Sequence, residues 1–342
     1  MSSHMTKPVV SIVIVNLNGA AFLSSCLSSV AKLARNPSFE VILVDNGSAD
    51  RSKRLIERFS QNKRLSVNAI FNKANIGFCG ANNQGARVAR GEFLLFLNND
   101  TEVPENLLAI LVAKLRQDTT IGIIQPKILL KNEPGHLDSV GGFLTWTGFL
   151  NHAGIHEVDK SQYDQEFMVF SPKGACMMIR KNLFGRVGGF DEDFFAYFEE
   201  TDLAWRVWLV GKKVLYYPAI SIDHLMGRTT RQLNFEFIQF HSFKNRLATL
   251  LKNLGFLSLW RLVVHLLIVI LLGLVYTLTG QVKSAKPIFK AIWWNITHLG
   301  STLKKRAAIQ GSRRVNDAFL KKVSKPLPIA KVIHDVIWFT HQ

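Results

Sequence analysis

The chain has 342 residues, of which 48% are hydrophobic and 20% charged, and 42 Lys and Arg against 25 Asp and Glu give a formal net charge of +17. This length suits one large domain or two ordinary ones. The apolar content, with 24 Phe and 7 Trp, supplies a large core and excludes an intrinsically disordered chain. Three scattered cysteines, Cys26, Cys79 and Cys176, cannot build a disulfide framework or a closed zinc site, so we expect buried thiols and a reduced cytosolic compartment.

Strands and helices alternate over the first 125 residues. Apolar, largely β-branched runs at 9–15, 40–44, 65–71, 93–97 and 121–124 predict strands that are buried on both faces of a sheet. Helical patterns lie near 20–34, 50–61, 80–90 and 105–117, with Ser48 or Asp50 suited to cap the second helix and Pro104 suited to the first turn of the last. This alternation predicts βαβ units, so the expected fold class is α/β with a doubly wound, mostly parallel sheet.

Polar residues follow three of these strands, at 16–19, 45–50 and 98–101, and a stretch rich in glycine and asparagine lies at 75–85. One such cluster is ordinary turn chemistry. Several clusters on one sheet indicate a pocket, because ligands of doubly wound sheets bind beyond the carboxyl ends of the strands. Glycines allow close backbone approach, and helix N-termini favour phosphate oxygens. With neither a P-loop nor a G-x-G-x-x-G after a strand, we expect a nucleoside diphosphate held in another way.

Positive charge is concentrated towards the end of the chain. Residues 281–342 hold 12 Lys and Arg against 2 acidic residues, a net charge of +10, whereas residues 1–280 hold a net charge of +7. Residues 256–280 are almost wholly apolar, interrupted by Arg261 and His265. We therefore predict a globular body over residues 1–230, a connecting helix over 231–255, and an apolar and basic helical region over 256–342.

Several ordered motifs of the body resemble one enzyme family. They lie at residues 11–15, 44–48, 75–78, 97–100, 189–192 and 197–203, and in order and spacing they are similar to the family 2 glycosyltransferases of the GT-A fold. Among these, the chain is most similar to the rhamnosyltransferase-like enzymes of bacterial surface polysaccharide assembly. The resemblance covers about residues 9–255. It implies a nucleotide-binding half at about 9–125, an acceptor and base half at about 126–230, and a donor that carries dTDP, UDP or GDP.

The resemblance also implies roles for individual residues. Asp45 binds the base or ribose, and Asp100 closes the D-x-D position of the family and holds a divalent metal, Mg²⁺ or Mn²⁺, on the diphosphate. A hard cation with oxygen ligands suits this leaving group, although Asn98 replaces one aspartate and should weaken metal binding. His224 is the second metal candidate or a structural histidine, with Arg228 and Arg231 as phosphate partners. The other donor-binding candidates are Val15, Asn16, Asn46, Asn75, Gly77, Asn83, Asn99, and the segment Lys173, Gly174 and Ala175, which is otherwise a β-turn.

Six carboxylates lie among aromatic residues between Asp191 and Asp202. Low dielectric and neighbouring like charges raise a carboxyl pKa towards the range of a general base. In the family that these motifs resemble, transfer inverts the anomeric centre and the base is the second residue of an acidic pair, which is Glu200 here. Glu199 and Asp202 are alternatives, and Asp202 can instead form a helical ion pair with Arg206.

The apolar segment and basic tail predict attachment to an anionic membrane. Residues 262–279 are long enough to span a bilayer, but a single span would carry the basic tail away from the cytosolic side. Interfacial or re-entrant attachment is therefore favoured, with Trp260 and Trp293 as anchors and Lys304, Lys305 and Arg306 on anionic headgroups. A true span, a second pass over 288–303, a core helix and a homo-oligomer contact are the alternatives. We expect an enzyme on the cytoplasmic face of the cytoplasmic membrane that acts on a lipid-linked saccharide.

Three other functions share some of these features. A basic tail can bind nucleic acid, but its apolar interleaving and the lack of a nucleic-acid motif indicate no such partner. Sugar nucleotidyltransferases use similar sheets, yet residues 16–22 lack the basic residue of their glycine-rich loop. A non-catalytic nucleotide-sugar or membrane-binding scaffold is the third, and Asn98 and Glu200, both unusual for the family, are the features that favour it.

Overall fold

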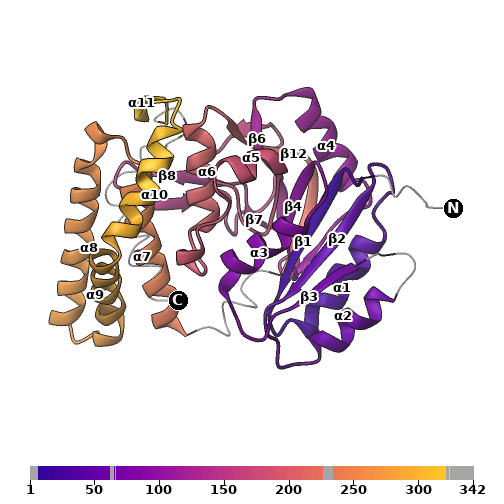
Figure 1. Ribbon diagram of the computed structural model, residues 1–342, viewed down its shortest axis with the longest axis horizontal. Coiled ribbons are helices and arrows are strands. Elements are labelled where there is room, and N and C mark those ends of the chain that lie inside the picture. Colours follow the sequence, from indigo (N-terminus) through magenta and orange to yellow (C-terminus); the bar gives the residue numbers. More distant parts are fainter. Residues whose placement is uncertain (1–6, 62–64, 66, 226–233, 321–322, 324–342) are drawn as a thin grey trace.

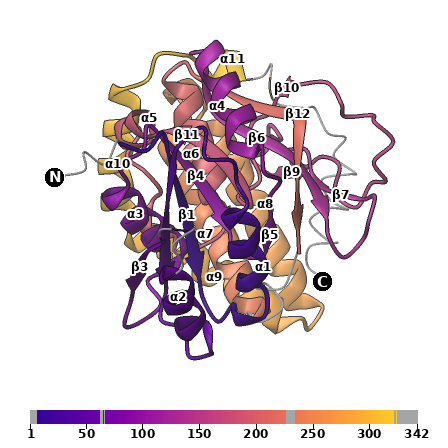
Figure 2. The same cartoon turned by 90° about the vertical axis from the view of Figure 1, so that its right-hand side faces the viewer.

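The computed structural model describes residues 7–61, 65, 67–225, 234–320 and 323. Its central sheet contains β1 (Val10–Asn16), β2 (Phe39–Asp45), β3 (Val67–Phe71), β4 (Phe93–Asn98), β5 (Thr101–Glu102), β6 (Ile121–Leu130), β7 (Leu137–Ser139), β10 (Phe167–Met168), β11 (Cys176–Arg180) and β12 (Lys213–His224). The strand order is β10-β12-β6-β11-β4-β1-β2-β3, with β5 paired to β12 and β7 to β6. Figure 2 shows β3 and β7 towards opposite sides of the molecule. A separate hairpin joins β8 (Gly142–Leu144) to β9 (Leu150–His152).

The sheet is mostly parallel. Strands β3, β2, β1 and β4 run in one direction, and β6 and β12 are parallel to each other. Strand β11 is antiparallel to both β4 and β6. The carboxyl ends of β1, β2, β4, β6 and β12 therefore lie at one edge, together with the amino end of β11. This confirms the predicted fold class.

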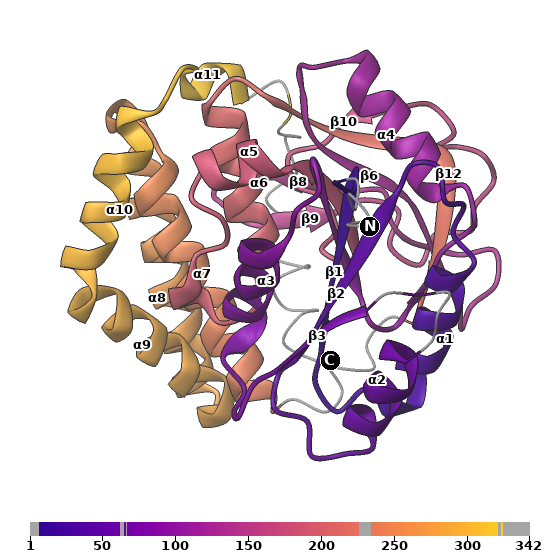
Figure 3. The same ribbon diagram turned by 45° about the vertical axis from the view of Figure 1, so that its right-hand side comes forward.

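Helices cover both faces of the sheet (Figure 3). They are α1 (Ala20–Ala31), α2 (Ser52–Ser60), α3 (Gly77–Val88), α4 (Leu107–Gln117), α5 (Lys181–Arg186) and α6 (Glu199–Leu209), with a 3₁₀ turn η1 at Glu192–Phe194. Successive side chains of a strand point to opposite faces. Ile12 accordingly packs in one core with Leu27 of α1 and Leu111 of α4. Its neighbour Val13 packs in a second core with Ala86 of α3.

The strands and helices predicted over the first 125 residues are confirmed to within a few residues, but the predicted place of Pro104 in the first turn of a helix is wrong. Helix α4 begins at Leu107, so Pro104 precedes the helix instead of lying in its first turn. Helix α2 begins at Ser52, whose backbone N–H donates to Asp50 Oδ1 at 2.9 Å. Asp50 is therefore the capping residue, while the Ser48 hydroxyl donates to Asp45 Oδ1.

A layer of helices stands at one side of the molecule (Figure 1). It consists of α7 (Phe235–Asn253), the 3₁₀ turn η3 (Phe256–Ser258), α8 (Trp260–Leu278), α9 (Val282–Thr297), α10 (Leu299–Gly311) and α11 (Asp317–Leu320). Helix α7 packs against α6, α8, α9 and α10. It therefore lies between the α/β body and the C-terminal helices.

Helix α8 exposes most of its apolar surface. Within the described ranges, Phe256–Leu278 is the one helical segment that is long and apolar enough to cross a membrane, with a mean hydropathy of 2.4. A narrow stripe that includes His265, Val269 and Gly273 is buried, and a Cβ on Gly273 would come within 2.9 Å of the Phe289 ring of α9. Other residues such as Leu271, which is 62% exposed, face outward.

Candidate functional site

Strand register brings the polar residues of the sequence motifs to one edge of the sheet. Asn16 ends β1 beside Asp45 at the end of β2. His224 ends β12 beside Thr101, the residue that follows Asp100. Val15, Asn98 and Ala175 lie at the same edge, because Val15 pairs with Asn98 and the Asn98 N–H donates to the Ala175 carbonyl at 2.9 Å.

The buried Asp45 carboxylate is held by its neighbours at this edge. Asp45 Oδ1 accepts hydrogen bonds from Asn16 Nδ2 at 2.9 Å and from the Ser48 hydroxyl at 2.6 Å. Asn16 Oδ1 in turn accepts from Asn99 Nδ2 at 2.7 Å. A Cβ on Gly19 would come within 2.4 Å of both amides, so this position requires glycine. These hydrogen bonds join three side chains, those of Asp45, Asn16 and Asn99, into one polar network, which we call the Asp45 floor.

Asn46 and Asn75 shape the loop that enters α3. Asn46 Nδ2 donates to Asn75 Oδ1 at 2.8 Å, and Asn46 Oδ1 accepts from the Ile76 N–H at 3.1 Å. Gly77 follows with a φ of +82°, and a Cβ there would come within 2.7 Å of the Phe195 ring and carbonyl. Glycine at this position therefore lets the loop before α6 pack directly on the start of α3.

Asn83 has a different role from the predicted donor contact. Its Nδ2 donates to the Phe190 carbonyl at 2.8 Å and to Glu192 Oε1 at 3.1 Å, while its Oδ1 accepts from the Phe190 N–H at 3.0 Å. These bonds use the amide to tie α3 to the acceptor half. Arg228 and Arg231, the predicted phosphate partners, lie outside the described residues.

His224 stands between two carboxylates. Its Nε2 lies 3.2 Å from Asp100 Oδ1, and its Nδ1 lies 2.7 Å from Asp138 Oδ2. Burial acts to lower the pKa of His224, but hydrogen bonds and charge from the two carboxylates raise it to about 9. Burial likewise acts to raise the pKa of Asp138, which Lys173 and His224 together lower to about 2.

This arrangement fits a divalent cation. Asp100 Oδ1 is buried with no hydrogen bond of good geometry, and carboxylate oxygen is the ligand type that Mg²⁺ and Mn²⁺ prefer. Asp138 fixes the His224 ring through Nδ1, as carboxylates behind metal-binding histidines do. Among the described residues, no three or more His, Cys, Asp or Glu side chains gather as a complete metal site. Asp100 and His224 would therefore be two ligands of a cation that also needs ligands from a bound phosphate or water.

Lys173, Gly174 and Ala175 connect this pair to the acidic cluster. The Lys173 N–H donates to Gln125 Oε1 at 2.6 Å, and its Nζ lies 3.5 Å from Asp138 Oδ1. A Cβ on Gly174 would lie 3.9 Å from the carboxyl carbon of Glu200. The segment thus spans the distance between the strand ends and the first turn of α6.

Glu199 and Glu200 open α6. Burial, followed by the charge of Glu200, raises the pKa of Glu199 well above its usual range, and Glu199 Oε2 is buried with no partner. Burial also raises the pKa of Glu200, although its own backbone N–H and Lys173 act to lower it. Glu200 keeps part of its surface exposed, whereas Glu199 is 8% exposed. Glu200 is therefore the better placed of the two to meet a substrate.

Asp202 forms the predicted helical ion pair. Its Oδ2 lies 2.8 Å from Arg206 Nη2, and its Oδ1 accepts from Asn253 Nδ2 at 2.9 Å and lies 3.1 Å from Lys252 Nζ. Burial acts to raise the pKa of Asp202, but Lys252 and Arg206 lower it overall. A buried, fully paired carboxylate of low pKa is a poor general base, so the structure favours the ion-pair role.

The loop before α6 has an unusual backbone. Phe195, Tyr197 and Phe198 have φ values of 66°, 70° and 69°. Such conformations cost roughly 1–3 kcal/mol each in residues other than glycine and persist where the surroundings enforce them. They also cluster at functional sites. Here the strained segment leads directly into Glu199 and Glu200.

Helix α7 supplies the groups that hold this loop. Asn245 Nδ2 donates to the carbonyls of Phe194, Ala196 and Tyr197 at 3.1, 2.8 and 2.6 Å. His241 Nδ1 donates to the Phe194 carbonyl at 3.0 Å. The sequence analysis missed both residues. Their spacing of four places polar side chains on one face of a helix, and this was the available signal.

A network of buried charges continues from α7 to α10. Lys252 Nζ bridges Asp191 and Asp202, and Lys305 Nζ of α10 pairs with Asp191 and Asp193. Asp193 is nonetheless exposed, so the acidic cluster is only partly buried, in contrast to the prediction. The C-terminal helices are therefore bonded directly to the acidic loop.

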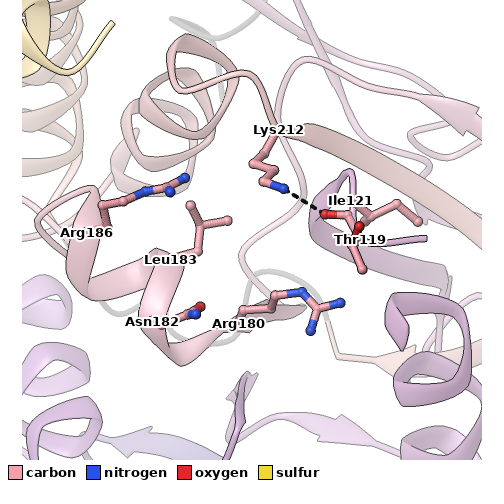
Figure 4. A pocket seen from close by; sticks show the side chains of 7 residues that line it. All are labelled: Thr119, Ile121, Arg180, Asn182, Leu183, Arg186 and Lys212. Atoms are coloured by element: carbon pink, nitrogen blue, oxygen red, sulfur yellow. Dashed lines mark hydrogen bonds between the residues drawn. The ribbon is translucent and has the colours of Figure 1, made fainter. Parts of the chain in front are cut away.

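Two cavities lie away from the strand ends. Figure 4 shows one of about 340 Å³, into which Arg180, Arg186 and Lys212 point, with Lys212 Nζ donating to the Thr119 carbonyl at 2.8 Å. Because Arg180 ends the antiparallel strand β11, this cavity stands at the opposite edge of the sheet. The other, of about 660 Å³, is lined from α3, α5 and α10 and includes Asn83 and Lys305.

Comparison with known proteins agrees with the motifs. The model of "Glycosyl transferase family 2" matches residues 11–187, just over half of the chain. The chain is 29% identical over 226 residues to the O-antigen biosynthesis protein RfbC of Myxococcus xanthus, covering 64% of this chain and 17% of that protein. It is 26% identical over 249 residues to the N-acetylglucosaminyl-diphospho-decaprenol L-rhamnosyltransferase of Mycobacterium tuberculosis, covering 65% and 78%. The chain thus spans a small part of the first relative and most of the second.

Solved structures share the fold. A crystal structure of GalNAc-T7 with UDP, GalNAc and Mn²⁺ matches with a TM-score of 0.54 at 23% identity, covering 63% of this chain and 43% of that one. The mannosyltransferase PcManGT from Pyrobaculum calidifontis, in complex with GDP-Man and Mn²⁺, matches with a TM-score of 0.53 at 15% identity, covering 90% and 86%. At these identities the likeness establishes the architecture.

Proposed function

Because the chain belongs to glycosyl transferase family 2, we propose that it transfers a sugar from a nucleotide-sugar donor to an acceptor hydroxyl, with inversion at the anomeric carbon. One observation carries the proposal: the Asp45 floor and the Asp100–His224 pair lie at the same edge of the sheet, and residues 173–175 connect that edge to Glu200. The proposed nucleoside pocket, the metal site and the base therefore follow one another in the same order as the nucleoside, diphosphate and sugar of the donor.

The donor lies across the carboxyl ends of β1, β2 and β4. Asp45 takes the base or ribose, and Asn16, Asn46, Asn75, Gly77, Asn98 and Asn99 shape the pocket around it. Neutral amides and glycines suit a nucleotide, because they offer hydrogen bonds and close backbone approach without repelling phosphate. UDP and GDP-Man in the two related structures support this class of donor, and dTDP-sugars belong to the same class.

Asp100 and His224 hold a divalent cation. Such a cation, when bound, stabilises the negative charge of the departing nucleoside diphosphate. Nδ1 of His224 donates to Asp138, and Nε2, which carries a proton while it faces Asp100 alone, would give up that proton to coordinate the cation when the cation binds. Mn²⁺ in both related structures supports this cofactor.

Glu200 is the catalytic base. Its carboxylate takes the proton of the acceptor hydroxyl as the acceptor oxygen bonds to the anomeric carbon and the bond from that carbon to the diphosphate oxygen breaks. A carboxyl pKa raised by burial makes Glu200 a stronger base than an exposed glutamate. The charge of Lys173 acts on Glu200 and limits this rise in its pKa.

The acceptor is a lipid-linked saccharide at the cytoplasmic face of a membrane, and rhamnose is the sugar that we favour. The name of the mycobacterial relative specifies a diphospho-decaprenol acceptor and L-rhamnose. The exposed apolar face of α8 supports peripheral or monotopic attachment. On this proposal residues 1–230 are catalytic, 231–255 connect, and 256–342 associate with the membrane.

Replacing Glu200 with Gln tests the proposal. We expect Glu200→Gln to bind UDP, dTDP or GDP with Mn²⁺ as the wild type does and to lose turnover by about a hundredfold or more, because the base is gone while the shape is kept. Calorimetry for binding and product formation from sugar-nucleotides measure the two effects. Glu192→Gln is the control, since that exposed carboxylate lies nearby. Normal turnover in Glu200→Gln would assign the role of base to Glu199. A wild-type protein that binds none of the three nucleotides would contradict the proposed function.

A further inference from the structure

Arg246 of α7 is a partly buried cation without a carboxylate partner among the described residues. Its guanidinium lies 4.8 Å from the centre of the Phe149 ring and 5.5 Å from the centres of the Phe198 and Phe243 rings. Its Nε is buried and has no hydrogen-bond partner within the part of the chain that the structure describes. The residue nevertheless keeps part of its surface accessible.

Three other buried cations near the acidic loop have a partner that accepts their hydrogen bonds. Arg206 pairs with Asp202, Lys252 pairs with both Asp202 and Asp191, and Lys244 donates to the Asp193 carbonyl. An unpaired buried charge is costly because the aromatic rings replace its water only in part. A site that keeps such a charge gains an advantage when an anion binds to it.

The residues around Arg246 indicate which kind of anion could bind to it. On one side, Phe198 directly precedes Glu199 and Glu200. On the other side, Phe149 ends the turn between β8 and β9, and α8 binds this same turn: Arg261 Nε donates to the Trp146 carbonyl at 2.7 Å and His265 Nδ1 donates to the Thr147 carbonyl at 2.6 Å. Arg246 therefore lies between the base and the start of the apolar helix.

Two exposed tryptophans mark the start of that helix. The rings of Trp146 and Trp260 lie 6.0 Å apart, and the two residues are 42% and 56% exposed. Tryptophans of this kind favour the boundary between lipid and water. The Asp100–His224 pair is connected to Glu200 through other residues, Asp138 and the segment 173–174. The residues that connect Arg246 to the base loop are therefore distinct from those that connect the Asp100–His224 pair to Glu200.

We propose that Arg246 binds the phosphate of a membrane-held acceptor. A lipid-linked saccharide carries lipid, phosphate and sugar in that order, and the protein presents α8, Arg246 and Glu200 in the same order. Arginine matches phosphate through paired N–H donors, and the surrounding rings strengthen that attraction by excluding water. This inference rests on the proposed function and adds the residue that selects an acceptor by its charge.

Binding to a short lipid diphosphate tests the inference. Calorimetry in detergent would measure farnesyl diphosphate, uncharged farnesol, and UDP with Mn²⁺ on the wild type, Arg246→Met and Arg246→Lys. Methionine keeps the apolar stem among the rings, and lysine keeps the charge. Arg35→Met is the matched control, because Arg35 stacks on Phe39 at 5.2 Å and is exposed.

We expect Arg246→Met to weaken farnesyl diphosphate binding at least tenfold and to change UDP affinity less than twofold, with Arg246→Lys recovering part of the loss. The thermal midpoint of Arg246→Met should equal or exceed that of the wild type, because removing an unpaired buried charge relieves its cost. An equal loss of UDP affinity would assign Arg246 to the donor, and a lowered midpoint without selective loss of binding would assign it to packing. Unchanged binding, or a wild type that binds UDP and not farnesyl diphosphate, would also overturn the inference while leaving the glycosyltransferase function intact.

Discussion

The donor edge and the base loop of this protein are held in place in contrasting ways. At the donor edge, Asn16, Asp45 and Asn99 bond one another at the ends of adjacent strands. In the base loop, the strained segment is held by Asn245, which follows about 50 residues later, and the acidic residues just before it are held by Lys305, which follows more than 100 residues later. The proposed donor pocket is thus a product of the sheet itself, whereas the position of Glu200, the proposed base, depends on helices that follow β12. Changes in those helices should therefore impair catalysis without affecting donor binding.

Asn245→Leu should show the largest difference between its effect on catalysis and its effect on donor binding. Three loop carbonyls would lose their shared donor, and leaving buried polar groups unpaired should lower the free energy of unfolding by about 2–4 kcal/mol. Relaxation of the strained loop should lower turnover about a hundredfold by misplacing Glu200. Affinity for UDP with Mn²⁺ should stay within about threefold. Urea unfolding, calorimetry and product formation measure the three quantities.

Asn295→Leu is the control for this change, because Asn295 of α9 donates to the Lys244 and Ala291 carbonyls outside the loop. Asn245→Asp or Asn245→Gln should recover less than half of the lost turnover, since neither side chain reproduces three bonds at this distance. Equal loss of turnover in Asn295→Leu would show that the C-terminal helices stabilise the protein without positioning the base.

Asp45→Ala should give the opposite pattern. Loss of the carboxylate removes a donor contact and leaves Asn16 without a partner, so nucleotide affinity should fall about ten- to fiftyfold, or roughly 1.4–2.3 kcal/mol. Turnover at saturating donor should fall less than threefold, because Glu200 is untouched. Calorimetry and a comparison of kcat and KM separate the effects, with Asp118→Ala, at a partly exposed aspartate after α4, as the control. A larger change in kcat than in KM would contradict the division between the regions.

The pH dependence of turnover sharpens the description of the base loop. Glu200 acts as carboxylate, so turnover should rise about tenfold per pH unit up to its pKa. Burial raises that pKa. The rise of turnover with pH, called the acid limb, should therefore have its midpoint above the pKa of an ordinary glutamate. Because Lys173 acts to lower the pKa of Glu200, Lys173→Met should move the limb to higher pH. A limb that stays unmoved in Lys173→Met, or that lies at the usual glutamate pKa, would contradict the assignment of Glu200.

Lys305→Met should have the smallest effect. Burial acts to raise the pKa of Asp191, but Lys252 and Lys305 lower it overall. This lowered pKa stabilises the fold above the unfolded-state pKa of about 4, and the stabilisation is lost as the pH falls towards the folded-state value. Since Lys305 is partly exposed, its removal should cost about 1 kcal/mol or less and lower turnover a few fold. Lys304→Met, at an exposed neighbour, is the control, and identical unfolding curves for the two variants at pH 7 and pH 4 would contradict the prediction.

Strand positions were predictable because β1, β2 and β4 are continuous apolar runs, and burial on both faces of a parallel sheet requires such runs. The residues at the strand ends were predictable for the same reason, since a parallel sheet brings the ends of its strands to one edge. Helix starts were less predictable. Asp50 caps α2 through Ser52, while Ser48, equally suitable by type, bonds Asp45 instead. Local sequence offers several polar side chains, and the tertiary neighbour decides which bond each one makes.

The sequence by itself determined the α/β class, the Asp45 and Asp100 motifs, the acidic cluster with Glu200, and an apolar helix, because each depends on residues close together in the chain. The tertiary structure alone decided which carboxylates are paired and which titrate high. Asp202 meets Lys252, and Glu199 meets no cation among the described residues, although the two lie three residues apart. It also decided that Asn245 holds the base loop and that Arg246 lacks a carboxylate. Pairing and burial depend on side chains that arrive from helices 50 to 100 residues away, and sequence spacing does not specify where those helices pack.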